Sequence, residues 1–326
     1  MTVFKKELAD HLGSKRFIIL FIIVIALATL SAYQGATAIK SNLGSGSYRG
    51  YQSSFTAIFS GAFGGMPFTY FMMLFGPIIG LALGFDAICK ERTSGSLSVL
   101  LSQPIVRDDV INGKFLAGFA ALSLIIVSTV GIMTGLAIPI MGFGPTAAEI
   151  TGTIVFTVLT ILYVGFWLAL SLMFSTLFKK TTTSILAVIS AWMFFTFAIT
   201  IIATLVSSAL VPVPNVFPTV VYGNQTSGPS QTQMQMYRDA SQLRQTLMTG
   251  ISSISPANLY TQASSMIFTG LNIGGGIYIG GGISPMRPST DLTQCWPQFT
   301  AIAVALVVCF IVAYMAFLRR EIRPGG

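Results

Sequence analysis

The sequence predicts an all-α integral membrane protein with six transmembrane helices, and its composition is the basis of that prediction. Charged residues comprise 18 Lys or Arg and 10 Asp or Glu, which is 9 % of 326 residues, whereas a soluble domain carries about 25 %. Hydrophobic residues make up 53 %. Many of them lie in uncharged runs whose length is close to the ~20 residues that a helix needs to cross a bilayer. An ordinary soluble fold is therefore excluded.

The six predicted spans together form a single transmembrane domain over residues 1–326. Ionisable residues occur only near the span ends, where Asp86 and Lys114 lie. Transporters driven by ion gradients usually bury such groups near the bilayer centre, so whatever drives this protein is expected to act outside the membrane. The spans cover approximately residues 17–39, 68–88, 113–141, 150–178, 183–211 and 297–318.

Residues 1–16 precede the first span and are predicted to form an amphipathic helix at the membrane interface. Phe4, Leu8 and Leu12 recur at helical spacing among basic residues, which is typical of a helix that lies on a membrane surface. Acidic residues in this stretch and the length of the first apolar run argue against a cleaved signal peptide.

Basic residues divide unequally between the two sides of the membrane. Thirteen of the 18 lie before the first span, after the last, or in the short segments after spans two and four. Since Lys and Arg gather on the cytoplasmic side, both termini are predicted to be cytoplasmic. Residues 212–296 then form a large external segment between spans five and six, in which 231–245 is expected to be a polar surface helix. The net charge of +8 is explained without a nucleic-acid partner.

Several kinds of catalytic and cofactor site are excluded by what the chain lacks. Three cysteines without a C-x-x-C pair and a single histidine, His11, cannot supply a zinc site or a histidine-based triad. The only Gly-Lys pair, Gly113-Lys114, has Asp108 in place of the first glycine of a phosphate-binding loop and Phe115 in place of its Ser or Thr. We therefore expect no catalytic residue, metal or cofactor in this chain.

Glycines repeat every four residues in two of the spans. Gly76, Gly80 and Gly84 share one face of the second span, and Gly131 and Gly135 share one face of the third. Small residues at this spacing let helix backbones approach closely. We interpret Gly76, Gly80 and Gly84 as a packing face, either within one subunit or between two.

The densest cluster of charges lies in the cytoplasmic loop between spans two and three, residues 89–112, and at its borders. Within this loop a short apolar helix is predicted, which contains Leu97, Leu100 and Leu101 and ends at Pro104. Apolar residues beside both signs of charge favour docking of a protein partner. The alternative is a solvated loop whose leucines enter the lipid headgroups.

The pattern of this loop resembles the signature of ABC-2 type transporter permeases, the membrane subunits of one class of ATP-binding-cassette transporter. Lys6-Glu7-Leu8 near the start and Ser255–Tyr260 before the last span also resemble that family. The residues that carry the resemblance in the loop are Glu91, Arg92, Gly95, Ser96, Leu97, Leu100, Leu101, Pro104 and Arg107, followed by Gly113-Lys114.

The resemblance implies a permease subunit in the cell membrane, surrounded by lipid and paired with a second permease subunit as a homodimer. The substrate path would lie between the two, with transport in the direction of export. Two separate ATP-hydrolysing subunits would bind ATP and Mg²⁺ and dock on residues 91–107, a coupling helix that contacts them through the nine residues named above.

Two alternatives from other classes remain. A membrane scaffold or assembly factor would recruit cytoplasmic partners without transporting anything. An intramembrane enzyme is disfavoured because no His, Asp or Glu lies at membrane depth, and Cys309 has no base beside it in the sequence.

Overall fold

A computed structural model describes residues 2–44, 55–61, 67–94, 107–213, 220–222, 225–227, 231–271 and 295–319. By its internal contacts the chain forms two compact units. The first comprises Met1–Ser190 and Tyr260–Gly326, and the second comprises Ala191–Leu259.

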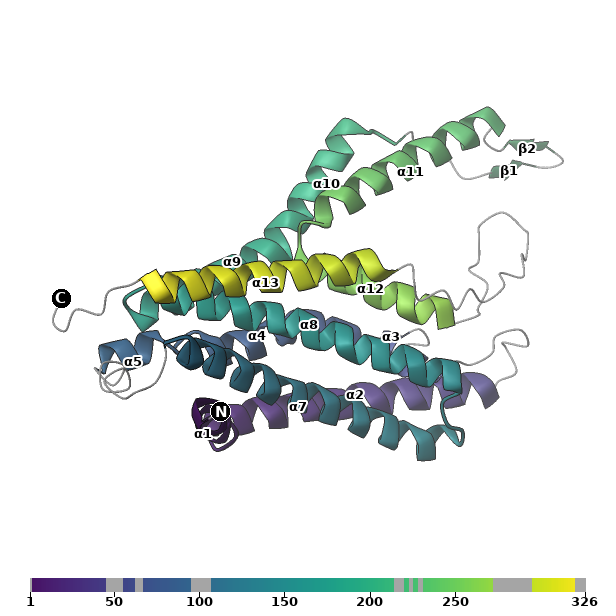
Figure 1. The fold of residues 1–326 in the computed structure, drawn as a ribbon. Helices are drawn as coiled ribbons and strands as arrows, with labels where there is room; N and C mark the ends of the chain where they lie inside the picture. Colours follow the sequence, from purple (N-terminus) through teal and green to yellow (C-terminus); the bar gives the residue numbers. More distant parts are fainter. Residues whose placement is uncertain are drawn as a thin grey trace. The chain divides into compact units, whose positions relative to one another are not determined.

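The first unit is a bundle of long helices. Helices α2, α4, α7, α8 and α13 run alongside one another, and α8 packs against α4, α7 and α13 (Figure 1). Most of α9 and α12 also belongs to this unit. The elements are α1 (Thr2–Leu12), α2 (Lys15–Gly44), α3 (Ala57–Ser60), α4 (Phe68–Gly84), α5 (Cys89–Thr93), α7 (Arg107–Met141), α8 (Ala147–Leu177), α9 (Thr181–Met193), α12 (Pro256–Leu271) and α13 (Trp296–Arg319).

Six helices among the described residues are long and apolar enough to cross a membrane. Each coincides with one predicted span, so the prediction of an all-α membrane protein with six spans is confirmed. The position of α1 at the membrane interface stays a prediction; α1 itself is a helix that packs against α7. The candidate spans are Lys15–Ser41, Phe68–Thr93, Asp108–Met141, Ala147–Leu177, Thr181–Leu210 and Trp296–Arg319.

Helix α8 forms the centre of the first unit. Its residues from Tyr163 to Leu172 are all buried, because a helix that is apolar on every side is surrounded by other helices. The Tyr163 hydroxyl donates to the carbonyl oxygen of Met73 at 2.8 Å, and its ring stacks on Tyr260 with 4.5 Å between centroids. One side chain of α8 thus contacts both α4, through its hydroxyl group, and α12, through its ring.

The glycine face of α4 packs directly on α8 of the same chain. A Cβ atom added at Gly80 would lie 2.7 Å from the carbonyl oxygen of Val164 and 2.8 Å from the amide nitrogen of Leu168. Added Cβ atoms at Gly76 and Gly84 would meet the same helix at 3.1 and 2.9 Å. The two backbones can approach this closely only because α4 presents glycine there.

Replacing Gly80 with leucine should therefore destabilise the bundle by about 1–3 kcal/mol, the usual cost of overpacking. Gly135 on α7 is the matched control, since an added Cβ there would meet no described atom within 4 Å. Thermal unfolding in detergent should show a lower midpoint for Gly80→Leu and a nearly unchanged one for Gly135→Leu. Equal midpoints for the two variants would contradict this packing.

The second unit contains the rest of α9, a π-helix η1 (Phe194–Ala198), α10 (Ile199–Leu210), β1 (Val220–Tyr222), β2 (Gln225–Ser227), α11 (Gln231–Ser252) and the start of α12. The two short strands form an antiparallel pair in which Val220 faces Ser227. Helix α11 includes the stretch that the sequence predicted as a polar surface helix.

The π-helix interrupts the fifth candidate span, and the Ser255–Tyr260 segment contacts it. A π-turn disturbs the regular pairing of helical carbonyl oxygens. The Ser255 hydroxyl donates to one of them, the carbonyl oxygen of Phe195, at 2.6 Å. The Asn258 side-chain amide donates to the Thr200 hydroxyl at 3.2 Å. The start of the Ser255–Tyr260 segment thus provides hydrogen-bond partners where the π-helix interrupts span five.

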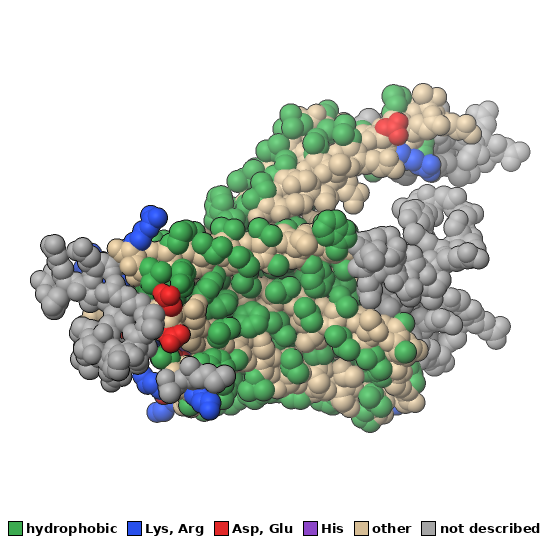
Figure 2. Space-filling model, in the orientation of Figure 1, with side chains coloured by type: hydrophobic (Ala, Val, Ile, Leu, Met, Phe, Trp, Pro, Cys, Tyr) green, Lys and Arg blue, Asp and Glu red, His purple; other side chains and the backbone are tan. Residues whose placement is uncertain are grey.

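Charged side chains are unevenly distributed over the first unit. On the face shown in Figure 2 they gather at the end where α1 and α5 lie, while hydrophobic side chains cover the middle. A surface of this kind matches a lipid-facing belt with one polar end.

Candidate functional site

The candidate site is the base of the predicted coupling loop, where α5 ends and α7 begins. The structure describes Glu91 and Arg92 in α5, and it places Arg107 as the first residue of α7. The coupling helix itself stays a prediction, because six of its residues lie outside the described part of the chain: Gly95, Ser96, Leu97, Leu100, Leu101 and Pro104.

Ser175 near the end of α8 holds the start of α5 in place. Its hydroxyl oxygen accepts hydrogen bonds from the backbone N–H groups of Ile88 and Cys89, both at 3.1 Å. The Cys89 thiol donates back to the carbonyl oxygen of Ser175 at 3.0 Å. All three residues are buried, so these bonds form away from competing water. Cys89 is a structural thiol in this position.

Arg92, also in α5, caps the C-terminal end of α8. Its guanidinium group donates to the carbonyl oxygens of Phe178 at 3.2 Å and Thr176 at 3.5 Å. The last carbonyl groups of a helix lack partners within the helix, and a cation stabilises them further through the helix dipole. The family resemblance implies that Arg92 contacts a partner subunit; in the structure its guanidinium group binds the end of α8.

Lys114 is the buried centre of the site. Its ammonium nitrogen lies 2.6 Å from Oε1 of Glu91 in α5 and 2.9 Å from Oε1 of Glu7 in α1. The Lys114 side chain is only 3 % exposed. A buried cation is tolerated only when it is paired and hydrogen-bonded. The Glu7–Lys114–Glu91 triad therefore fixes α1, α5 and α7 to one another at the base of the loop.

A second ion pair joins the start of α2 to the end of the second span. Arg16 at the start of α2 lies 2.6 Å from the Asp86 carboxylate, between Nη1 and Oδ2, and its guanidinium carbon lies 5.5 Å from the centre of the Phe85 ring. The Arg16 side chain is 58 % exposed, so the pair contributes little to stability. It does orient the start of α2 against the end of span two.

His11 lies close to both acidic and basic groups of this region. Burial lowers the pKa of His11 below its ordinary value of 6.5, and Lys114 lowers it further, while Glu7, Asp86 and Asp10 act in the opposite direction. The imidazole is therefore neutral at pH 7 and adds no charge to the triad. Among the residues that the structure describes, no group of three or more His, Cys, Asp or Glu could hold a metal ion.

The family model described as "ABC-2 family transporter protein" matches residues 1–322. The chain belongs to this family. Over 123 residues it is 30 % identical to the probable ABC transporter permease protein NosY of Pseudomonas aeruginosa and 31 % identical to that of Stutzerimonas stutzeri. The matched stretch is 38 % of this chain and spans 40 % of each relative.

Membership in the ABC-2 family agrees with two expectations from the sequence. The family consists of transport proteins, in line with the expectation that the chain is not an enzyme. Together with the six apolar helices, it makes the chain a multi-pass membrane protein.

The sequence did not assign three of the residues that build this site to it: Glu7, Arg16 and Ser175. For Glu7 a signal existed, because it follows Val3 by four residues and so lies on the same helical face. Val3 is buried against α7, where an added Cβ at Gly113 would lie 2.9 Å from Val3 Cγ1. Ser175 gave no signal, since a serine near a helix end has many common uses.

Proposed function

We propose that this chain is the permease subunit of an ABC transporter. Two copies would form the substrate path between them and export the substrate across the cell membrane. Two separate ATP-hydrolysing subunits would dock on the loop of residues 91–107, and ATP and Mg²⁺ would bind in those subunits. Both termini of the permease would be cytoplasmic.

The observation that carries this proposal is the buried triad at the base of the loop. Helix α5 leads into the loop and α7 leads out of it. The ion pair between Glu91 and Lys114 joins these two helices. The bond from Ile88 to Ser175 joins the start of α5 to α8. A loop with a fixed base transmits a displacement to the spans, whereas a loop on a mobile base would absorb it. This is the property that a coupling element needs.

Two further facts support a separate source of energy. The chain contains no phosphate-binding loop, and the relatives it resembles carry the name of ABC transporter permeases. The six spans hold no ionisable residue near their centres, so an ion gradient has no site on which to act there.

The decisive experiment purifies the tagged chain with its ATP-binding partner and compares ATP hydrolysis by the partner alone and by the complex in liposomes. We expect the rate to change when the permease is present, because coupling is reciprocal. An identical rate would instead favour a membrane scaffold that recruits the partner without transport.

The orientation has its own test. Thirteen of 18 basic residues lie on the proposed cytoplasmic side. Reporter fusions after Gly326 and within α11 should therefore report opposite sides of the membrane, cytoplasmic for the first and external for the second. The same side for both would overturn the proposed topology.

A further inference from the structure

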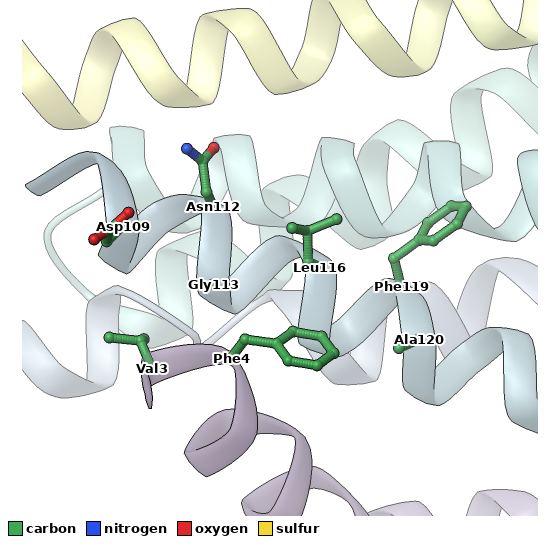
Figure 3. A pocket seen from close by; sticks show the side chains of 8 residues that line it. All are labelled: Val3, Phe4, Asp109, Asn112, Gly113, Leu116, Phe119 and Ala120. Atoms are coloured by element: carbon green, nitrogen blue, oxygen red, sulfur yellow. The ribbon is translucent and has the colours of Figure 1, made fainter. Parts of the chain in front are cut away.

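A groove lies between α1 and α7 on the first unit, next to the triad but distinct from it. It has a volume of about 460 Å³, within the ~300–1,000 Å³ of most ligand sites. Asp109 and Asn112 lie at one end, and Phe119 and Ala120 lie at the other (Figure 3). The remaining lining residues are Val3, Phe4, Gly113 and Leu116.

The groove has the depth of one membrane leaflet. Asp109 lies in the first turn of α7, and Ala120 follows eleven residues later, which is roughly 16 Å along a helix at about 1.5 Å per residue. Half of a hydrocarbon core about 30 Å thick is ~15 Å. With the polar end at the predicted headgroup level of α1, the groove would extend as far as the end of the acyl chains.

Its walls change character along this path. Phe4, Leu116, Phe119 and Ala120 offer only carbon atoms to an occupant, and the Leu116 side chain is 52 % exposed. At the polar end the Asp109 carboxylate is exposed, and it forms no ion pair with a side chain that the structure describes. Such a groove matches an amphiphile with an acyl chain and a cationic, hydrogen-bonding head.

We propose that this groove binds a phospholipid with a primary-amine head, namely phosphatidylethanolamine, from the leaflet that contains α1. Its ammonium group carries three N–H donors, the same inventory as a lysine side chain, for the Asp109 carboxylate and the Asn112 carbonyl oxygen. One acyl chain follows Leu116 to Ala120. Lys5 and Lys6 follow Phe4 on α1 and are exposed, and we assign the lipid phosphate to them.

The charge of the site distinguishes this lipid from its competitors. A choline head is a quaternary ammonium without N–H donors, and a phosphatidylglycerol head carries a negative charge without a cation, which Asp109 repels. The many basic residues on this side of the chain attract anionic lipids in general. A preference for ethanolamine over glycerol heads would therefore come from the groove and not from the overall charge.

The test reconstitutes the full chain in nanodiscs of equal parts phosphatidylethanolamine, phosphatidylcholine and phosphatidylglycerol. After mild detergent extraction, native mass spectrometry counts the lipids retained. We expect ethanolamine lipid to be enriched on the wild type. Asp109→Asn should lower that enrichment by roughly tenfold, as expected for loss of one charge-assisted hydrogen bond. Asp10→Asn, which neutralises an exposed carboxylate on α1 outside the groove, should leave it unchanged.

A second variant tests the acyl-chain end. Ala120→Phe fills the apolar part and should reduce retained lipid of every head class, while thermal unfolding shows that the variant is folded. Retention of the three lipids in equal parts by the wild type would overturn the proposal, as would enrichment of the glycerol lipid. Undiminished retention by Ala120→Phe would place the bound lipid elsewhere and would also overturn it.

Discussion

Replacing Lys114 with methionine should destabilise the folded chain by about 3–5 kcal/mol, the usual effect of removing one partner from a buried ion pair. The ammonium nitrogen of Lys114 lies within 2.9 Å of two carboxylates and its side chain is 3 % exposed. Methionine keeps the length and apolar character of the stem. It leaves Glu7 and Glu91, whose side chains are only 13 % and 23 % exposed, without their shared cation. Thermal unfolding in detergent measures the effect.

Two further variants separate the lost charge from the lost side chain. Lys90→Met removes an exposed lysine from α5, next to Glu91, and should change the unfolding midpoint little. Combining Lys114→Met with Glu7→Gln and Glu91→Gln removes all three charges, and it should restore much of the lost stability because no carboxylate is then left unpaired. If the triple variant is as unstable as Lys114→Met alone, packing and not charge pairing explains the loss.

The sequence was sufficient to predict the six spans because the bilayer imposes a constraint that composition records directly. A spanning helix needs about 20 apolar residues and must satisfy its own backbone polar groups, so each uncharged run predicted a helix without any knowledge of its neighbours. The helix bounds differ mainly at the ends. The third candidate span begins at Asp108, several residues before the predicted start at 113, because a helix continues into water where charged residues are tolerated.

Pairing between distant residues could not be predicted in the same way. The triad joins Glu7 to Lys114, which are 107 positions apart, and the packing of α1 on α7 decides which face of α1 is buried. The sequence showed the stripe of Phe4, Leu8 and Leu12 but did not indicate that Glu7 would face α7. A buried lysine that requires acidic partners is recognisable only once its burial is known.

The glycine face shows a similar division. The spacing of Gly76, Gly80 and Gly84 indicated a close helix contact but left open whether the neighbour belonged to the same subunit. The backbone of α8 at Val164 and Leu168 occupies the space next to Gly80, so this contact lies within one chain. Gly131 and Gly135 have the same spacing, yet an added Cβ at either would meet no described atom within 4 Å. The same spacing of glycines thus occurs on a buried helix contact in α4 and on an open face of α7.

Introducing aspartate at Leu100 should detach or uncouple the ATP-hydrolysing subunit. This prediction rests on the proposed function and on the sequence of the loop, since Leu100 lies outside the described residues. Leu97, Leu100 and Leu101 are expected to fill a cleft on the partner. Truncating a buried apolar anchor at an interface typically costs about 2 kcal/mol or more, and charges at the rim matter less. Burying an added carboxylate without a partner raises that cost.

The control for Leu100→Asp is Ser102→Asp, which adds the same charge two positions later without removing an apolar side chain. Co-purification of the partner and its ATPase rate in liposomes should fall strongly for Leu100→Asp and little for Ser102→Asp. The neutral triad variant provides a third comparison. It keeps the leucines but loosens the base of the loop, so it should retain the partner while transmitting less of its ATP-driven movement. If Leu100→Asp keeps both the partner and the wild-type rate, the loop is a connector at the membrane surface and the ATP-hydrolysing subunit docks elsewhere.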